Sequence, residues 1–263
     1  MRRGRSRRLP ASSAGLYSRS MLIMFTGMVH RSNSAPSLYR VPGCSARGWS
    51  VASASALSAA ALDAAANANT SVWGVRQYAD EFANDRSEFL VISETSPSME
   101  ILRGDASAGS PPHWLGQACV SSVCGESSLL NIAVHPKARR RGYGALLVLS
   151  ALAAAHRTQQ ESFFLEVRSR NVAAVALYAA CALEQVGRRP RYYQSPRDDA
   201  LLWSFRFTDQ DALAVLAEII ERNPHRDLIN AYAELRHGAC LTQESGSVGM
   251  DVICDQLVGE MRL

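Results

Sequence analysis

Residues 135–149, HPKARRRGYGALLVL, place three consecutive arginines before a Gly-x-Gly pair and then an apolar run. A strand-like stretch at 128–134 precedes this loop and a helical pattern begins near Gly142, so together they predict a strand–turn–helix unit. The first turn of a helix presents unpaired N–H groups and the positive end of the helix dipole. Gly142 and Gly144 lack a Cβ, which lets the backbone come close to an anion. The spacing therefore predicts a loop that binds a phosphate-containing ligand.

The same arginines could instead belong to a basic patch for nucleic acid, which usually brings further basic and aromatic residues on one face. Residues 1–50 carry nine arginines and no acidic residue, and removing those nine charges from the formal net charge of +4 leaves −5 for the remainder. The loop also lacks the Lys-Ser/Thr of a Walker loop and the longer Gly-x-Gly-x-x-Gly of a dinucleotide fold. We therefore expect a small phosphate-containing ligand and no nucleic acid.

Glu166 lies within the strand-like run SFFLEVR at 162–168. A strand covered on both faces is usually apolar throughout, and a carboxylate there costs free energy unless it is paired or used. Alternation along the strand places Phe164, Glu166 and Arg168 on one face. We predict that Glu166 is a buried general base, and the alternative is a salt bridge between Glu166 and Arg168.

A helical pattern over 171–182 brings Asn171 and Tyr178 together. Helical steps place Asn171, Val175, Tyr178 and Ala182 along one face, so Asn171 and Tyr178 can meet a common ligand. The alternative for Tyr178 is a core tyrosine whose hydroxyl has a hydrogen-bond partner.

The six cysteines show no C-x-x-C pair and no partnering histidine spacing. Disulfide frameworks are typical of short, cysteine-dense secreted chains, and this chain is neither short nor dense in cysteine. We expect reduced thiols that are mostly buried, and no metal site. His135 follows a strand without a nucleophile in a recognisable motif, so we interpret it as a loop residue.

The elements that must position these residues follow from hydrophobic periodicity. The chain has 263 residues and is 47% hydrophobic, which suffices for one substantial core. The order of elements predicts a mixed α/β sheet with helices on its faces. The expected strands are 49–56, 87–94, 114–123, 128–134, 162–168 and 200–207, and the expected helices are 56–68, 72–85, 142–156 and 171–182. A long loop rich in Pro, Gly and Ser covers 95–113.

The domain is expected to span 47–208, followed by a helical C-terminal extension over 209–263. Thr208 and Asp211 predict a variant capping box for a helix that ends near Asn223, and a second helix is expected over 226–236. Packing of the extension on its own domain is the default expectation, with dimerisation and partner binding as alternatives. No stretch approaches the roughly 20 apolar residues needed to span a bilayer, so no membrane partner is expected.

Residues 1–46 are rich in Arg and Ser and contain no Asp or Glu, a composition typical of an organelle transit peptide. A plain disordered tail is an alternative, as is a secretory signal built on MLIMFTGMV at 21–29. A transit peptide would direct the protein to a mitochondrion or plastid, and otherwise a cytoplasmic location is expected.

Three ordered motifs resemble a known family. The stretch NIAVHPKARRRGYGALL resembles motif A of the GNAT acetyltransferases, with Arg139-x-x-Gly142-x-Gly144 matching their Arg/Gln-x-x-Gly-x-Gly/Ala signature. FLEVRSRNVAAVALYAACAL and RRPRYYQSPRDDALLW are similar to the ribosomal-protein alanine N-acetyltransferases of the RimI type. The resemblance is dense from Ser128 to Phe207 and thinner over 49–123. It implies the GNAT fold, acetyl-CoA as co-substrate, and the N-terminal α-amine of a small-subunit ribosomal protein or similar protein as acceptor.

The resemblance also implies a cofactor site. The backbone of Ile132, Ala133 and Val134 would pair with the acetyl-pantetheine arm as an added strand does, and Asn171 would bond to the CoA chain. The residues that would hold the pyrophosphate are Arg139, Arg140, Arg141, Gly142, Tyr143, Gly144 and Ala145.

For the chemistry, the resemblance implies that Glu166 is the general base and that Tyr178 protonates the departing CoA thiolate. Tyr192 and Tyr193 look like the paired tyrosines that line the peptide groove of protein N-terminal acetyltransferases, with the alternative of aromatic packing in a hairpin. Two aspartates that follow, Asp198 and Asp199, match the acidic pair usual in the family.

One departure from the family is the sequence Cys181-Ala182-Leu183 at a position where members usually have Leu-Gly-Phe. Two further enzyme classes stay open, a catalytic subunit of a eukaryotic N-terminal acetyltransferase and a small-amine GNAT enzyme, as does a non-catalytic GNAT domain. The eukaryotic subunits usually carry a histidine at the position of Glu166, which favours the RimI type. Retention of both Glu166 and Tyr178 argues against a non-catalytic domain.

Overall fold

A single mixed sheet organises the protein in the computed structural model, which describes residues 28–29, 37–42, 49–67, 72–93 and 114–237. The eight described strands lie in the order β1-β2-β3-β4-β5-β6-β8-β7, and β5 and β6 pair in parallel while the other neighbours are antiparallel. The strands are β1 (Met28–Val29), β2 (Ser37–Pro42), β3 (Ser87–Ser93), β4 (Trp114–Val123), β5 (Glu126–Val134), β6 (Ser162–Arg168), β7 (Glu184–Gln194) and β8 (Arg197–Arg206).

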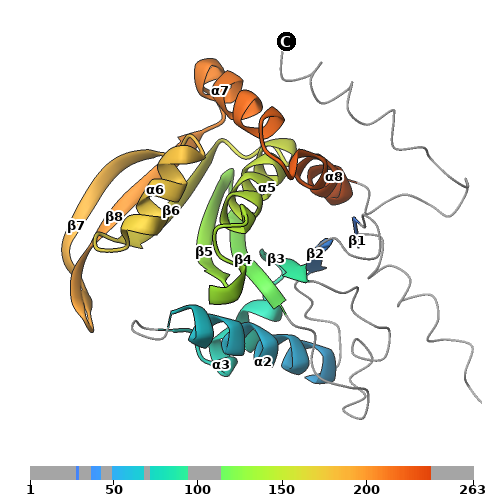
Figure 1. Ribbon diagram of the computed structural model, residues 1–263, viewed down its shortest axis with the longest axis vertical. Coiled ribbons are helices and arrows are strands. Elements are labelled where there is room, and N and C mark those ends of the chain that lie inside the picture. Colours follow the sequence, from blue (N-terminus) through green and yellow to red (C-terminus); the bar gives the residue numbers. More distant parts are fainter. Residues whose placement is uncertain (1–27, 30–36, 43–48, 68–71, 94–113, 238–263) are drawn as a thin grey trace, which may run out of the picture.

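Helices cover both faces of the sheet (Figure 1). They are α2 (Trp49–Ala66), α3 (Val75–Phe82), α5 (Tyr143–Arg157), α6 (Val172–Ala180), α7 (Gln210–Glu221) and α8 (Arg226–His237), with a 3-10 turn η1 (Pro136–Ala138). The larger core lies around α5, whose Leu146, Leu147 and Leu149 are fully buried. A second core lies under α2 and α3, where Phe82 stacks on Phe89 of β3 at 3.8 Å between ring centroids. The expected α/β fold is therefore confirmed.

Most expected elements from residue 72 onward are found within a few residues of their expected ends, and β6 and β4 match their expected ranges. The missed element is β7, because its residues EQVGRRPRYYQ are exposed along nearly the whole strand. A strand that buries neither face has no period-two hydrophobic pattern for sequence reasoning to detect. It lies at the edge of the sheet, which is also where Pro190 is tolerated.

The strand expected at 49–56 is wrong, because these residues form the first turns of α2. Their weak alternation consists mainly of Ala and Ser, and alanine has the highest helix propensity of all residues. The alanine-rich run therefore continues the helix toward its N-terminus.

The expectation that residues 1–46 lie outside the domain is wrong for 37–42. These residues form β2, which pairs with β3 through registers such as Leu38 with Ile92, and Leu38 is fully buried in the larger core. The proposed targeting signal at 1–46 otherwise lies outside the described residues, apart from β1.

We expect that Leu38→Ala lowers the free energy of unfolding by about 2–3 kcal/mol, since it removes buried methyl groups and leaves a cavity. A chain that begins at Gly48 lacks β2 altogether and should lose at least as much stability. Denaturant unfolding measures both losses. Leu57→Ala is the matched control because Leu57 is 58% exposed, and it should change stability by less than about 0.5 kcal/mol. Equal stabilities of the Leu38 variant and the control would contradict a place for β2 in the core.

The C-terminal helices pack on the domain as expected. Leu216 of α7 and Ile229 of α8 are buried in the larger core together with α5. The capping residue of α7 is Asp209 rather than Thr208, since the Asp209 carboxylate accepts hydrogen bonds from the N–H groups of Asp211 and Ala212 at 3.0 and 3.1 Å. None of the helices within the described ranges is long and apolar enough to cross a membrane.

Candidate active site

The sheet splits open between β5 and β6. Their parallel pairing joins Glu126–Leu129 only to Ser162–Leu165, and no register continues beyond Leu129. The cause is a bulge in β5: Val120 of β4 pairs with Leu129 and Cys119 pairs with Asn131, so Leu130 is an extra residue. A bulge bends its strand and increases the local twist. The β6-facing edge of 130–134 therefore has no strand partner among the described residues.

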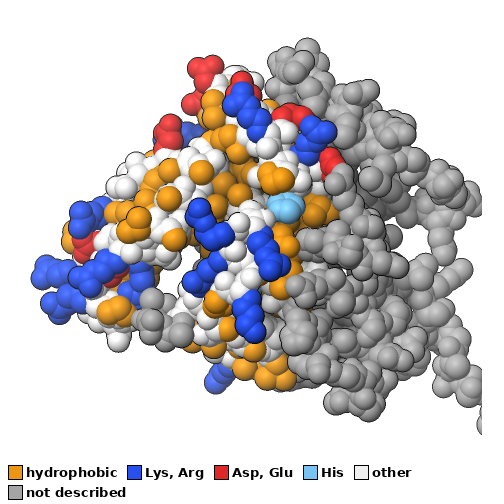
Figure 2. All heavy atoms as spheres, in the orientation of Figure 1, with side chains coloured by type: hydrophobic (Ala, Val, Ile, Leu, Met, Phe, Trp, Pro, Cys, Tyr) orange, Lys and Arg blue, Asp and Glu red, His pale blue; other side chains and the backbone are white. Residues whose placement is uncertain are grey.

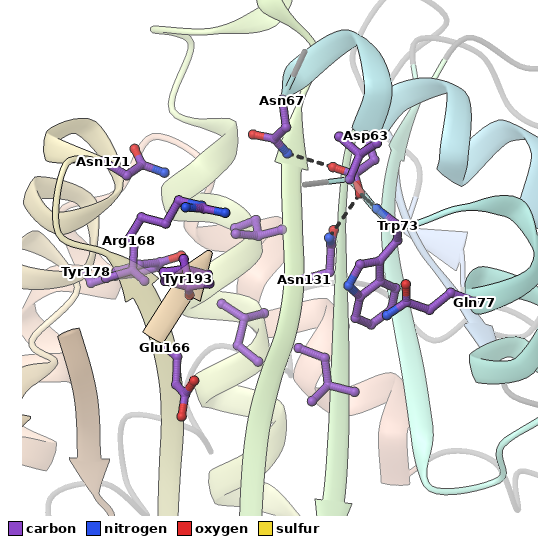
Figure 3. Close-up of a pocket in the computed structure, with 15 residues that line it drawn as sticks. Asp63, Asn67, Trp73, Gln77, Asn131, Glu166, Arg168, Asn171, Tyr178 and Tyr193 are labelled. Carbon is purple, nitrogen blue, oxygen red and sulfur yellow. Dashed lines mark hydrogen bonds between the residues drawn. The ribbon is translucent and has the colours of Figure 1, made fainter. Parts of the chain in front are cut away.

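A cavity of about 410 Å³ occupies this split (Figure 3). One wall comes from α2, α3 and the segment between them, and the other comes from β6, α6 and β7. Five residues expected at the site line it, namely Ile132, Glu166, Asn171, Tyr178 and Tyr193. Expected residues that do not line it are Ala133, Val134, Tyr192 and the loop from Arg139 to Ala145.

Tyr178 reaches the cavity from the last turns of α6 and is only 3% exposed. Burial raises the pKa of its phenol, and the nearby Tyr193 adds to this shift. Burial also raises the pKa of Tyr193, whose ring lies 4.0 Å from the Arg168 guanidinium. Both phenols are therefore protonated at neutral pH, so each can donate a proton or a hydrogen bond into the cavity.

The burial expected for Glu166 is wrong. Its side chain is 33% exposed, and Oε1 accepts a 2.5 Å ion-pair hydrogen bond from Nη1 of Arg189 on β7. Strand β6 alternates between buried and accessible side chains, and Phe164 and Glu166 lie on its accessible face. The alternative of a salt bridge between Glu166 and Arg168 was also wrong. The Arg168 guanidinium instead donates hydrogen bonds to the carbonyls of Ser195 and Pro196 at 3.1 and 2.8 Å.

Asn171 lines the same cavity as Tyr178, although it is the N-cap residue that precedes α6 and does not belong to the helix. Its Oδ1 caps α6 by accepting a hydrogen bond from the Ala174 N–H at 3.2 Å. Because Oδ1 is used for the cap, the side-chain NH2 group of Asn171 is the group left to donate a hydrogen bond into the cavity.

The loop before α5 has a backbone suited to an anion. Gly142 is the N-cap of α5 with φ of +82°, and Arg140 also has a positive φ of +64°. Arg140 and Arg141 are exposed, whereas the Arg139 guanidinium donates hydrogen bonds to backbone carbonyls. Its Nη2 donates to Ala66 at the end of α2 at 2.6 Å, and its Nε donates to Val134 at 3.4 Å. Arg139 therefore ties the loop to α2 instead of presenting its charge freely.

Three further loop residues face the protein interior. Tyr143 is 6% exposed and Ala145 packs against the larger core. A Cβ on Gly144 would lie 3.1 Å from Leu177 of α6, so this glycine lets α5 and α6 approach closely. Any ligand contact from these residues must therefore come from their backbone N–H groups.

The β7–β8 hairpin holds Tyr193 at the cavity, whereas Tyr192 is 48% exposed and meets Tyr193 edge-on at 5.1 Å. Asp198 fixes the hairpin to the turn after β6 by accepting a 2.7 Å hydrogen bond from the Ser169 hydroxyl, which lowers the pKa of Asp198. Asp199 accepts from the Arg191 N–H and pairs with Arg188, which lowers its pKa as well. Figure 2 shows basic side chains gathered at the end of this hairpin, whose basic residues are all arginines.

Sequence reasoning missed a polar network on the opposite wall. The Asp63 carboxylate is 1% exposed and accepts hydrogen bonds from Asn67, Tyr78, Asn131 and the backbone N–H of Trp73 at 2.6–3.3 Å. These bonds join α2 to α3 and to the bulged part of β5. The sequence offered one signal for this network: Asp63 is a single acidic residue within the alanine-rich run of α2.

Other sequence expectations concern cysteines, His135 and metals. Cys119 and Cys181 are buried free thiols, and burial raises the pKa of Cys181 to about 12, whereas Cys124 is exposed. His135 is a loop residue as expected, with Nδ1 accepting from the Lys137 N–H. Within the described ranges, no group of three or more His, Cys, Asp or Glu side chains could hold a metal ion.

The departure from the family at Ala182 has a conformational cost. Ala182 has φ of +63°, and the Leu183 N–H donates to the Tyr178 carbonyl at 3.1 Å, so α6 ends in a Schellman motif that favours glycine. We expect Ala182→Gly to raise the free energy of unfolding by about 1 kcal/mol. Ala176→Gly, in the right-handed interior of α6, should instead lower it by roughly 0.5–1 kcal/mol. Thermal unfolding measures both, and a loss of stability in Ala182→Gly would contradict the strain.

Known proteins resemble this chain. Residues 59–182 match the Acetyltransferase (GNAT) family. The [ribosomal protein bS18]-alanine N-acetyltransferase of Escherichia coli K12 is 33% identical over 87 residues, which cover 32% of this chain and 59% of that protein. The chain thus spans about three fifths of the length of the curated relatives it matches.

Solved structures include the E. coli ribosomal-protein-S18-alanine N-acetyltransferase, with 22% identity and a TM-score of 0.47 over 58% of this chain and 87% of that one. An acetyltransferase from Bacillus subtilis in complex with CoA has 14% identity and a TM-score of 0.41 over 56% of this chain and 89% of that one. The family match itself runs from α2 to the end of α6 and contains the loop before α5, Glu166 and Tyr178. The chain therefore contains a GNAT acetyltransferase domain that includes residues 59–182.

Proposed function

We propose that the protein transfers the acetyl group of acetyl-CoA to the α-amine of a protein N-terminus. The acceptor we favour is the N-terminal alanine of a small-subunit ribosomal protein or a similar N-terminus. The observation that carries this proposal is the cavity in the split between β5 and β6, whose lining includes both Tyr178 and Glu166.

The site fits acetyl-CoA on two grounds. The unpaired edge of 130–134 offers backbone groups for the amide-containing pantetheine arm, as a sheet edge does for an added strand. The N-terminus of α5, preceded by Gly142 and the exposed Arg140 and Arg141, suits a pyrophosphate. Together they support an orientation in which the thioester end lies in the split and the charged end lies at the loop.

The reaction needs two proton transfers. The acceptor ammonium must lose a proton before its nitrogen attacks the thioester carbonyl carbon, and Glu166 takes that proton directly or through water. As the new C–N bond forms, the C–S bond breaks and the thiolate accepts a proton from the Tyr178 hydroxyl. The products are an N-acetylated N-terminus and CoA as the thiol.

The acceptor side is the wall opposite Tyr178. Trp73 and Asp63 line this part of the cavity, and Tyr193 lines the wall that carries Tyr178. The negative charge of Asp63 is held by neutral hydrogen-bond donors, so the wall favours an approaching ammonium over a neutral or anionic group.

The test is acetyl-CoA turnover with peptides that begin with Ala, Ser, Met or Gly, each with a matching peptide whose N-terminus is blocked. Acetylation should be followed by mass spectrometry, because the exposed Cys124 would react with thiol reagents. We expect acetylation of the free N-termini, with the Ala peptide preferred. Turnover of polyamines alone would indicate a small-amine enzyme, and CoA binding without turnover would indicate a non-catalytic domain.

A further inference from the structure

A histidine from the C-terminal helices contacts the loop before α5. His225 lies in the turn between α7 and α8, and its Nε2 is 3.0 Å from the carbonyl oxygen of Arg141. The His225 ring packs on the Tyr143 ring at 5.6 Å between centroids. A Cβ on Gly142 would lie 3.2 Å from the same Nε2. Arg141 and Tyr143 are thus in contact with one side chain, and the absence of a Cβ at Gly142 leaves room for that side chain between them.

The position of His225 is itself fixed. Its backbone N–H donates to Oδ1 of Asn223 at 2.9 Å, and its carbonyl accepts from the N–H of Leu228 at 3.0 Å in the first turn of α8. Helix α8 is anchored in turn, since Leu228 and Ile229 are buried against α5 and the hydroxyl of the buried Tyr232 donates to Glu88. His225 therefore presents its ring to the loop from a rigid support.

The contact acts on the orientation of one peptide group. A peptide unit is planar and trans, so the carbonyl of Arg141 and the N–H of Gly142 point in opposite directions. A carbonyl only accepts hydrogen bonds, so Nε2 carries the hydrogen and donates it to Arg141. A carbonyl held toward His225 aims the Gly142 N–H to the other side of the loop, away from His225.

The loop needs this support because its backbone is strained. Arg140 adopts φ of +64°, a left-handed conformation that is unfavourable for a residue with a Cβ. Such conformations persist only where the surrounding structure determines them. Arg140 is exposed, and the family match ends at residue 182, so the support from His225 comes from helices beyond the matched region.

We infer that His225 is a positioning residue of the pyrophosphate site, which it prepares by holding the Arg141 carbonyl and thereby aiming the Gly142 N–H at the anion. The inference rests on the proposed acetyl-CoA function. It makes the C-terminal helices part of the cofactor site instead of a separate appendage.

The experiment uses the full chain with His225→Ala, His225→Gln and the control His156→Ala. His156 packs on Phe207 at the same 5.6 Å ring distance but at the other end of α5, far from the loop in sequence. Calorimetry measures the Kd for CoA, amide hydrogen exchange of 139–145 is followed without ligand, and thermal unfolding checks the fold.

We expect His225→Ala to raise the Kd for CoA about five- to tenfold, as the loss of one hydrogen bond predicts, and to speed exchange of the loop amides. The kcat at saturating acetyl-CoA should change by less than about twofold. His225→Gln keeps a side-chain N–H donor and should recover most of the affinity, and His156→Ala should leave the Kd and loop exchange unchanged.

An unchanged Kd or unchanged loop exchange in His225→Ala would overturn the inference. Equal Kd losses in His225→Ala and His156→Ala would overturn it too, because they would indicate a general loss of stability. Failure of the proposed function is a different result, since the unsubstituted protein itself would then bind no CoA, or would bind it without turnover. Loop exchange, measured without ligand, would still show whether His225 orders the loop.

Discussion

Tyr178→Phe is expected to lower kcat by about 10²–10³-fold while the Kd for acetyl-CoA stays within about threefold, within the usual contribution of general acid catalysis. The substitution removes one hydroxyl and keeps the ring that packs beside Trp203 in the larger core. Burial raises the pKa of Tyr178 above its ordinary value near 10, so the hydroxyl is protonated throughout the working range. Raising the pH from about 7 to 9 should therefore not restore the rate, because the thiolate still departs without a donor.

Tyr193→Phe is the matched control, since it removes a hydroxyl from the same cavity and leaves the ring beneath Arg168. We expect it to act mainly on the KM for the peptide and to lower kcat by less than about tenfold. Steady-state kinetics with both substrates varied separates the two variants. Equal losses of kcat in the two variants would show that either hydroxyl of the cavity matters to the same degree. Tyr178 would then not be the specific proton donor to the CoA thiolate. A loss of acetyl-CoA affinity with kcat intact would make Tyr178 a binding group.

Local patterns were enough to predict the elements that carry these side chains. Strand β6 alternates with a period of 2, helix α5 is a continuous apolar run rich in Ala and Leu, and Gly142 between β5 and α5 marks a helix start. The same patterns did not show which face of β6 is covered, because coverage depends on helices that are distant in sequence. The expected burial of Glu166 failed for this reason, although its place on the strand was correct.

Features that depend on pairing between distant segments could not be predicted from the sequence. The bulge at Leu130, which opens the cavity, is visible only in the register of β4 against β5. Leu38 is buried because β2 adds to the edge formed by β3, and six residues within an arginine-rich segment give too short a pattern to indicate this. Asp63 likewise acquires its role from Tyr78 and Asn131, which come from other elements.

Glu166→Gln is expected to lower kcat/KM by about 10²–10³-fold at neutral pH. Glutamine keeps the size of the side chain but cannot take a proton from the acceptor ammonium. An α-amino group has an ordinary pKa of about 7.7–8.0, so raising the pH from about 7 to 9 makes most of the substrate amine neutral before it binds. The rate of this variant should then recover substantially, in contrast to Tyr178→Phe. A pH profile of kcat/KM for the Ala peptide measures the recovery.

The ion pair between Glu166 and Arg189 supplies the decisive comparison, because Glu166→Gln also breaks this contact between β6 and β7. Arg189→Gln breaks the same ion pair but keeps the carboxylate. If Glu166 is the base, Arg189→Gln should cost less than about tenfold in kcat/KM and should show no extra recovery at high pH. If the two variants lose equal activity with equal pH profiles, Glu166 serves only to hold the strand of Tyr193 in place. Proton removal from the acceptor would then belong to another group or to water, while the acid role of Tyr178 would still stand.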